Sequence, residues 1–368
     1  MTVPAKLTFN YSEFGEKLFR QAFAAKKPIA GGMELTHRCN LRCVHCYVAS
    51  DKYPPELTTG QWFQLIDEVA DQGCLWWYIT GGEAMIRPDF LDIYLHCKRR
   101  GMIISLLTNA TCISEKIADT LGEYPPHVVE ISMYGATPET FDRVGKVKFG
   151  YPRFLKGIER LMVRRIAFNL KTMVLRENMA EVHRIRQFAQ SLGVSFRYDA
   201  VVNSRIDYAQ SPHQHAITPR EVVDLELQDP NKARQMQQFC ENHMGTAQND
   251  NLYQCGAGRS TFNIDPYGRL SVCLLSRRPN YPLLQGSFEE AWDQVQTEIN
   301  KKRQKDIPCT SCNLRQLCGN CAGSSELKYY EQEAHDPDLC ELADLRAEAF
   351  GITDGRTRQE LYEKENLS

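Results

Sequence analysis

The sequence has no apolar run that approaches the ~20 residues of a membrane-spanning helix. Residues 1–6 lack the charged and then apolar segments that build a signal peptide. Internal repeats and low-complexity tracts are also missing. These absences predict a cytoplasmic protein that does not enter a membrane.

Net charge is nearly absent as well. The chain has 44 Lys and Arg residues against 46 Asp and Glu residues, which gives a net charge of −2. This balance argues against a nucleic acid or another polyanion as partner, and basic clusters such as Lys98–Arg100 are interpreted as solvated helix faces. With 368 residues, 42% of them hydrophobic, the chain is long enough for one large barrel and a smaller domain.

Cysteine, in contrast, is abundant. Fourteen cysteines in a cytoplasmic protein indicate metal or cluster ligation rather than disulfides. Three lie between residues 39 and 46 and seven between residues 255 and 340. This distribution predicts a catalytic N-terminal half and a cluster-binding C-terminal half. The expected segments are a lead (1–30), a core (31–235), an auxiliary-cluster domain (236–350) and a tail (351–368).

The first cysteine group has the spacing CxxxCxxC, at Cys39, Cys43 and Cys46, directly after a predicted strand over 33–36. Three thiolates on one short loop suit three irons of a [4Fe–4S] cubane and leave the fourth iron open. An open metal position is a reaction site. A structural zinc loop is the alternative, because CxxC spacings also bind zinc.

Strand-like and helix-like segments alternate through the first half, which predicts parallel strands joined by crossover helices. Thr58 with Gln61 and Thr218 with Glu221 form predicted capping boxes, and Thr137 precedes a proline at a helix start. Six such units predict an α/β fold, an open partial (β/α)6 barrel of TIM type with its chemistry at the C-terminal strand ends. Strands are expected at 33–36, 75–80, 103–108, 128–134, 168–174 and 194–201, and helices near 58–72, 88–100, 113–121, 151–165 and 178–191.

One strand after the cysteine loop stands the string Gly81-Gly82-Glu83. The cysteine loop followed by this motif resembles the radical S-adenosylmethionine (radical SAM) superfamily. The resemblance implies that the open iron chelates the amino and carboxylate groups of SAM. One electron then cleaves SAM to a 5′-deoxyadenosyl radical, while the three motif residues contact the SAM amino group. It also implies that His45 stacks on adenine, and that the strand-end residues Asn109 and Ser132, with Arg143 after the fourth strand, line the ribose and carboxylate pocket.

The second cysteine group resembles the SPASM domain found behind radical SAM cores in peptide maturases, with a hairpin expected over residues 262–273. The resemblance implies two auxiliary iron–sulfur clusters, expected to be [4Fe–4S]. A zinc knuckle remains an alternative for the CxxC pairs. By match, one cluster takes Cys255, Cys273 and Cys321, and the other takes Cys309, Cys312, Cys318 and Cys340.

The chain departs from the SPASM pattern at several positions. The last spacing within the tight cysteine group is x2, where x3 is commoner. Thr261 stands where some relatives have a fourth ligand of the first auxiliary cluster, which leaves Cys240 or an open iron for that place. Leu274 replaces the aspartate of sulfatase-maturing relatives, which argues against that activity.

The expected function is hydrogen abstraction from a ribosomally made peptide that undergoes crosslinking, oxidation or epimerisation. A small-molecule dehydrogenase or decarboxylase, acting on a sugar or tetrapyrrole precursor, is the alternative, and a non-catalytic docking protein is a third hypothesis. Expected partners are an electron donor such as a flavodoxin or ferredoxin, and a separate leader-binding protein, with direct capture of the peptide by the core as the alternative. Cys112 is a candidate hydrogen donor, against a packing role. His213 and His215 are candidates for a site edge, against surface placement.

Overall fold

The computed structural model describes residues 11–48, 54–243, 250–305 and 307–352. Six parallel strands alternate with helices, which confirms the predicted partial barrel. The strands are β1 (Ala30–Thr36), β2 (Trp76–Gly81), β3 (Ile103–Thr108), β4 (Val128–Ser132), β5 (Phe168–Met173) and β6 (Phe196–Asp199).

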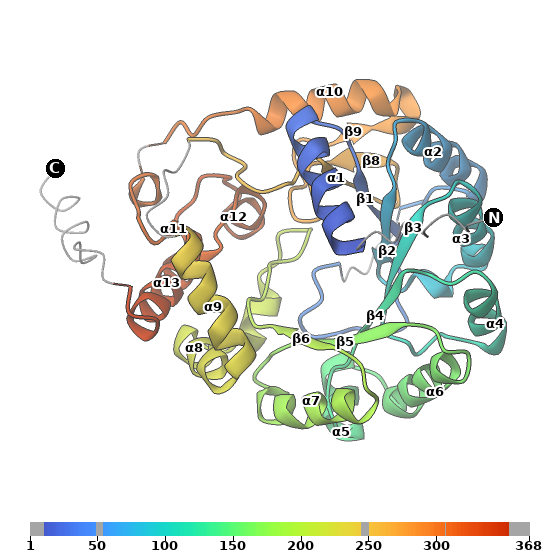
Figure 1. Cartoon of the computed structure of the whole chain (residues 1–368), viewed down its shortest axis with the longest axis horizontal. Coiled ribbons are helices and arrows are strands. Elements are labelled where there is room, and N and C mark those ends of the chain that lie inside the picture. The colour runs from blue at the N-terminus through green and yellow to red at the C-terminus, as the bar shows by residue number, and fades with distance from the viewer. Residues whose placement is uncertain (1–10, 49–53, 244–249, 306, 353–368) are drawn as a thin grey trace, which may run out of the picture.

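Helices cover the outer side of the curved sheet (Figure 1). Helix α1 (Tyr11–Ala25) precedes β1, a helix that lies within the predicted lead segment. The crossovers contain α2 (Thr59–Asp71), α3 (Phe90–Arg99), α4 (Glu115–Glu123), α5 (Pro138–Gly145), α6 (Gly150–Val163) and α7 (Val182–Ser191). Across the described ranges, no helix has the length and apolar character to span a bilayer.

The predicted helix starts are confirmed at atomic detail. Thr58 caps α2 in a full capping box with Gln61, and Thr218 does the same with Glu221 for α8 (Pro219–Gln228). Thr137 caps α5 with proline at the first helical position. These side chains satisfy backbone N–H groups that a helix leaves without partners, and they fix where each crossover begins.

The C-terminal half joins the same sheet. Strand β7 (Thr261–Ile264) pairs parallel with β1, and β8 (Arg269–Ser271) and β9 (Tyr281–Pro282) follow antiparallel, so the nine-stranded order is β6-β5-β4-β3-β2-β1-β7-β8-β9. The predicted hairpin is confirmed, but its place beside β1 was not foreseen. The remaining helices are α9 (Pro230–His243), α10 (Phe288–Ile299), α11 (Arg315–Cys318), α12 (Ala322–Tyr329) and α13 (Pro337–Ala349). The predicted boundary at residue 236 falls inside α9.

The two faces of the sheet differ in chemistry. Met33, Leu35 and Ile79 pack into the large hydrophobic core. Because side chains alternate along a strand, Glu34 and Tyr78 lie on the opposite, inner face. An apolar outer face and a polar inner face leave the interior of the open barrel suited to polar ligands.

Candidate active site and auxiliary cysteine sites

The loop after β1 carries the first cysteine motif, and backbone hydrogen bonds fix its path. Arg42 N donates to Gly145 O (2.9 Å) and Val44 N donates to Val144 O (3.0 Å). The C-terminal end of α5 therefore holds the loop against the C-terminal rim of the barrel, where the fold places its chemistry.

Cys39, Cys43 and Cys46 are each partly buried on this loop. Burial raises the pKa of Cys39 to about 12 and raises the pKa of Cys43 well above its usual range, and the neighbouring thiols add to both shifts. Iron would supply the positive charge that these thiols need for ionisation, and three soft thiols fit three corners of a cubane. Within the described residues, no three His, Cys, Asp or Glu side chains form a compact site for a single metal ion.

The glycines of the Gly81-Gly82-Glu83 motif allow the end of β2 to touch the start of the cysteine loop. A Cβ on Gly81, whose φ is +119°, would lie 2.2 Å from Thr36 O, and one on Gly82 would lie 2.2 Å from Arg38 O. Gly82 N donates to Thr36 O (2.7 Å), and Glu83 N donates to Arg38 O (2.9 Å). Only glycine fits this contact without displacing the loop.

The Glu83 carboxylate is fully buried, and its hydrogen bonds are to groups of the protein. It accepts hydrogen bonds from Thr108 Oγ1 (2.8 Å), Asn109 N (2.9 Å) and Met85 N (3.3 Å). Burial raises its pKa despite these bonds. The side chain braces the end of β3 against β2, so in this structure Glu83 acts as a positioning residue for the motif.

Asn109 connects the end of β3 to the cysteine loop. Its Nδ2 donates to Asn40 Oδ1 (3.1 Å) and lies 3.8 Å from Cys39 Sγ. Asn40 in turn donates to Thr111 Oγ1 (2.7 Å). Asn109 was predicted to line the SAM pocket, and the structure places it in contact with the first thiol.

His45 lies against Tyr134, with ring centroids 5.6 Å apart. Its buried Nδ1 has no hydrogen-bond partner among the described residues, and burial lowers its pKa to about 4, so the ring is neutral at pH 7. The Tyr134 hydroxyl is hydrogen bonded to Cys43. A neutral imidazole with a spare nitrogen is compatible with the predicted contact to a flat base.

The other predicted residues of the first half are placed as follows. Ser132 ends β4 and is half-buried, whereas Arg143 is exposed on α5 and donates to Glu177 O (2.9 Å). Cys112 is half-buried, and burial raises its pKa to about 11. Cys112 also adds to the rise in the pKa of Cys39.

The two histidines predicted at a site edge, His213 and His215, both have hydrogen-bond partners. His213 Nε2 lies 2.9 Å from Ser204 Oγ, and His215 Nδ1 is hydrogen bonded to Glu177 Oε1. The other Glu177 oxygen is buried without a hydrogen-bond partner among the described residues. After burial, His215 also lowers the pKa of His45. No sequence motif indicated Glu177 as a site residue.

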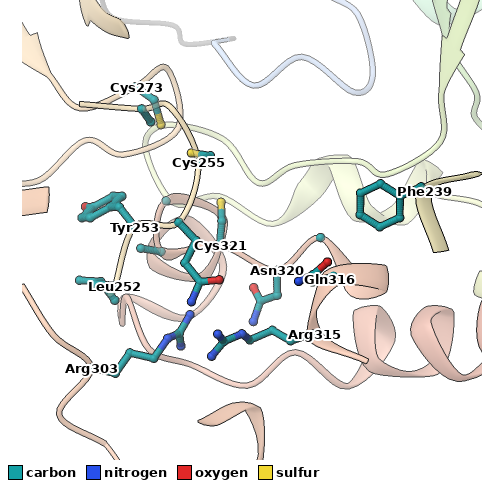
Figure 2. Close-up of a pocket in the computed structure, with 15 residues that line it drawn as sticks. Phe239, Leu252, Tyr253, Cys255, Cys273, Arg303, Arg315, Gln316, Asn320 and Cys321 are labelled. Carbon is teal, nitrogen blue, oxygen red and sulfur yellow. The ribbon is translucent and has the colours of Figure 1, made fainter. Parts of the chain in front are cut away.

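A cavity of 470 Å³ brings together the three thiols predicted for the first auxiliary cluster. Cys255, Cys273 and Cys321 come from three separate segments and line one region of this cavity (Figure 2). Burial raises the pKa of Cys273 to about 11, and Cys321 and Cys255 add to the shift. The donor set fits an iron–sulfur cluster.

The second predicted set of cluster ligands consists of Cys309, Cys312, Cys318 and Cys340. Burial raises the pKa of Cys318 to about 11, and Cys309 and Cys312 add to the shift. Cys340 is buried on α13, and its Sγ lies 3.2 Å from His335 Nε2.

The two positions considered for a fourth ligand of the first cluster lie elsewhere. Cys240 packs with Leu317 and Cys318, and it does not line the cavity. Thr261 Oγ1 donates to Gly256 O (3.1 Å) and does not line the cavity either.

A buried ion pair that the sequence did not reveal joins the two halves. Arg277 donates to both carboxylate oxygens of Glu34, at 2.8 and 3.1 Å, and Asn263 Nδ2 adds a third bond at 3.0 Å. Burial acts to raise the pKa of Glu34, but Arg277 and then His37 outweigh it and hold that pKa at about 2. Arg277 follows Cys273 by four residues, so the pair connects β1 to the segment that carries this thiol.

Comparison with known proteins agrees with this geometry. Residues 33–189 match the family model described as the Radical SAM superfamily. That range contains the cysteine loop and the glycine motif. This part of the chain is a radical SAM domain.

Curated relatives extend the comparison. The chain is 35% identical to the AdoMet-dependent heme synthase of Methanosarcina barkeri over 162 residues, which is 44% of this chain and 46% of that protein. It is 27% identical to the antilisterial bacteriocin subtilosin biosynthesis protein AlbA of Bacillus subtilis, over 86% of this chain and 71% of that protein. It is 26% identical to the PqqA peptide cyclase of Rhizobium meliloti, over 87% and 88%.

The fold is similar to that of SuiB from Streptococcus suis, with a TM-score of 0.69, 15% identity, and coverage of 91% of this chain and 84% of that one. SuiB has also been solved with its precursor peptide SuiA bound. The matches to AlbA and to the PqqA peptide cyclase extend over both halves of this chain.

Proposed function

We propose that the protein is a peptide maturase that abstracts a hydrogen atom from a ribosomally made peptide. The observation that carries this proposal is the extent of the matches. AlbA and the PqqA peptide cyclase match over 86% and 87% of this chain, and so extend well beyond the radical SAM domain. The heme synthase matches over 44% only.

In this proposal Cys39, Cys43 and Cys46 hold a [4Fe–4S] cluster, and SAM binds beside it. When bound, the cluster supplies the electron that cleaves SAM to a 5′-deoxyadenosyl radical. The protein's own part is positioning. Asn109 and Tyr134 orient the thiols, because groups that bond to ligands fix their geometry. Positioning matters because an adenosyl radical attacks almost any nearby C–H bond.

Two further SAM contacts belong to the proposal. The backbone of Gly81 and Gly82 borders the amino group of SAM, and His45 stacks on adenine with Ser132 on the ribose side. Arg143 is a weaker candidate for the SAM carboxylate, since its guanidinium is exposed and bonded to Glu177 O.

The proposal also assigns the second cysteine group to two auxiliary iron–sulfur clusters. Cys255, Cys273 and Cys321 hold one in the 470 Å³ cavity, with a fourth iron open to a non-cysteine ligand. Cys309, Cys312, Cys318 and Cys340 hold the other. A flavodoxin or ferredoxin in the cytoplasm supplies the electron, and a leader-binding protein presents the peptide.

The test offers both substrate classes to the same enzyme. Holoenzyme, dithionite and SAM are incubated with peptides encoded next to its gene, and in parallel with tetrapyrrole precursors. The proposal expects 5′-deoxyadenosine to rise with one peptide, together with a hydrogen-loss or epimer signature in that peptide by mass spectrometry. Turnover of a tetrapyrrole alone would replace this function with the heme-related alternative, which the heme synthase match favours.

A further inference from the structure

A basic surface lies beside the loop that carries the first cysteine group. Residues 143–156 include five cations and no carboxylate, although the whole chain has a net charge of −2. All five cationic side chains are exposed: Arg143, Lys146, Lys148, Arg153 and Lys156. In the described part of the chain none of these five forms an ion pair, whereas Arg160 and Arg164 farther along do. The positive charge of this basic surface is therefore not neutralised within the protein.

Backbone hydrogen bonds place the basic surface next to the cysteine loop. Arg42 N donates to Gly145 O (2.9 Å). Val44 N donates to Val144 O (3.0 Å). Both residues that flank the middle cysteine of the motif are thus bound to the end of α5, and the chain continues from there through the exposed segment to α6. A molecule seated on the basic surface would lie against the support of the cysteine loop.

The same surface presents a large aromatic ring in a fixed conformation. The Asp142 carboxylate accepts hydrogen bonds from Phe149 N (2.7 Å) and Gly150 N (2.8 Å), and Arg153 Nε donates to Phe149 O (3.1 Å). Phe149 is held at a φ of +58°, which is uncommon outside glycine, with 74% of the residue exposed. Aromatic side chains are enriched where proteins bind one another. An exposed ring among cations fits a protein partner better than a small anion.

Charge and position together specify that partner. A cationic surface steers partners of negative charge toward it. We propose that residues 143–156 are the docking surface for an acidic one-electron carrier protein. The carrier is oxidised by one electron, which reduces the cluster on the adjacent loop, and no proton or ligand moves. The inference rests on the proposed function and adds the place where the electron donor binds.

The first readout is the binding of a labelled bacterial flavodoxin to the reconstituted holoenzyme, followed by fluorescence anisotropy. The double variant Lys146→Glu with Lys148→Glu should weaken binding about tenfold in about 0.05 M NaCl, because attraction becomes repulsion. In about 0.5 M NaCl, where exposed charges are screened, the loss should largely disappear. The matched control is Lys27→Glu with Arg99→Glu, the same charge change on exposed residues at the opposite rim, where β1 and β3 begin. It should bind close to the wild type.

The second readout separates docking from the chemistry. With reduced flavodoxin as electron source, the double variant at Lys146 and Lys148 should form 5′-deoxyadenosine about tenfold more slowly than the control. With dithionite, a small reductant that needs no docking surface, the two proteins should form it at equal rates. Lys146→Gln with Lys148→Gln removes the charge without reversal, and replaces the Glu variant if that protein assembles poorly.

Equal flavodoxin affinity in the Lys146/Lys148 variant and in its control would overturn the inference. Slower product with dithionite together with weaker binding of the peptide would also overturn it, because the surface would then belong to the substrate. A wild-type protein that forms no 5′-deoxyadenosine with either reductant, while it still binds flavodoxin through these lysines, would remove the radical chemistry from the proposed function and leave the docking surface in place.

Discussion

Individual residues at this site depend on neighbours that carry no metal. Asn109 contacts Cys39, and Tyr134 is bonded to Cys43. Farther inward, Glu34 has its charge satisfied by Arg277, Asn263 and His37. Asn109 and Tyr134 follow other strands than the one that precedes the thiols. The positions of the thiols therefore depend on the packing of several strands of the barrel.

Glu34→Gln should destabilise the protein, because it leaves Arg277 buried without its partner. Breaking a buried pair costs about 3–5 kcal/mol in the free energy of unfolding. The pKa of Glu34 is held at about 2, below its ordinary 4.5, so the pair stabilises the fold above pH 4.5 and loses that contribution as pH falls toward 2. Urea unfolding of the apoprotein from pH 7 to pH 3 should show the wild-type advantage shrinking with acid.

Arg205→Gln is the control for that comparison. It breaks a more exposed ion pair with Asp207 and should cost about 1 kcal/mol or less. A Glu34→Gln protein as stable as Arg205→Gln at pH 7 would refute the role of the buried pair.

His45 provides a prediction about SAM binding. His45→Phe keeps a flat ring and should retain SAM affinity, whereas His45→Ala should weaken it about tenfold through loss of ring contact. Since the pKa of His45 is about 4, protonation of this ring should contribute no change in affinity between pH 6 and 8. Calorimetric titration of each holoenzyme with SAM, repeated across this pH range, measures these affinities. Equal SAM affinities of the His45→Phe and His45→Ala variants would exclude stacking.

The elements of the barrel were predictable from local signals. Thr58 and Thr218 mark helix starts through bonds within three residues, and the strands alternate regularly with the helices along the sequence. The pairing of β7 with β1 was not predictable, because nothing near residue 261 specifies its partner strand. Glu34 was missed for the same reason: its partner Arg277 lies 243 residues away. Cys255, Cys273 and Cys321 line one cavity, and only the family pattern suggested that grouping.

The substitution Gly82→Ala tests the contact between the end of β2 and the cysteine loop. The added Cβ would lie 2.2 Å from the carbonyl oxygen of Arg38, so the loop must shift, at a cost of about 1–3 kcal/mol. Iron content and thermal stability should both fall. Gly60→Ala is the matched control: it lies in α2 with nothing within 4 Å of its Cβ, and should stabilise by about 0.5–1 kcal/mol. Iron content equal in both variants would count against the loop contact.

Among the described residues, the N-terminal and C-terminal halves of the chain share one sheet. Strand β7 extends the sheet from β1, the Glu34–Arg277 pair crosses the same seam, and Trp292 Nε1 donates to Lys26 O (3.0 Å). The hydrophobic core of the barrel therefore continues into the C-terminal half of the chain.

Because they share this sheet, the two halves should unfold together. Calorimetry of the apoprotein is expected to show one cooperative transition, with calorimetric and van't Hoff enthalpies equal. Two separate transitions would show that the shared sheet does not couple the halves.

The central claim, radical SAM chemistry at Cys39, Cys43 and Cys46, is tested most directly by one measurement. The protein is reconstituted anaerobically, reduced with dithionite and given SAM, and 5′-deoxyadenosine is quantified beside a variant with all three cysteines changed to Ala. We expect product from the wild type and none from the triple variant. Zinc in place of iron, or equal product from both proteins, would contradict the claim.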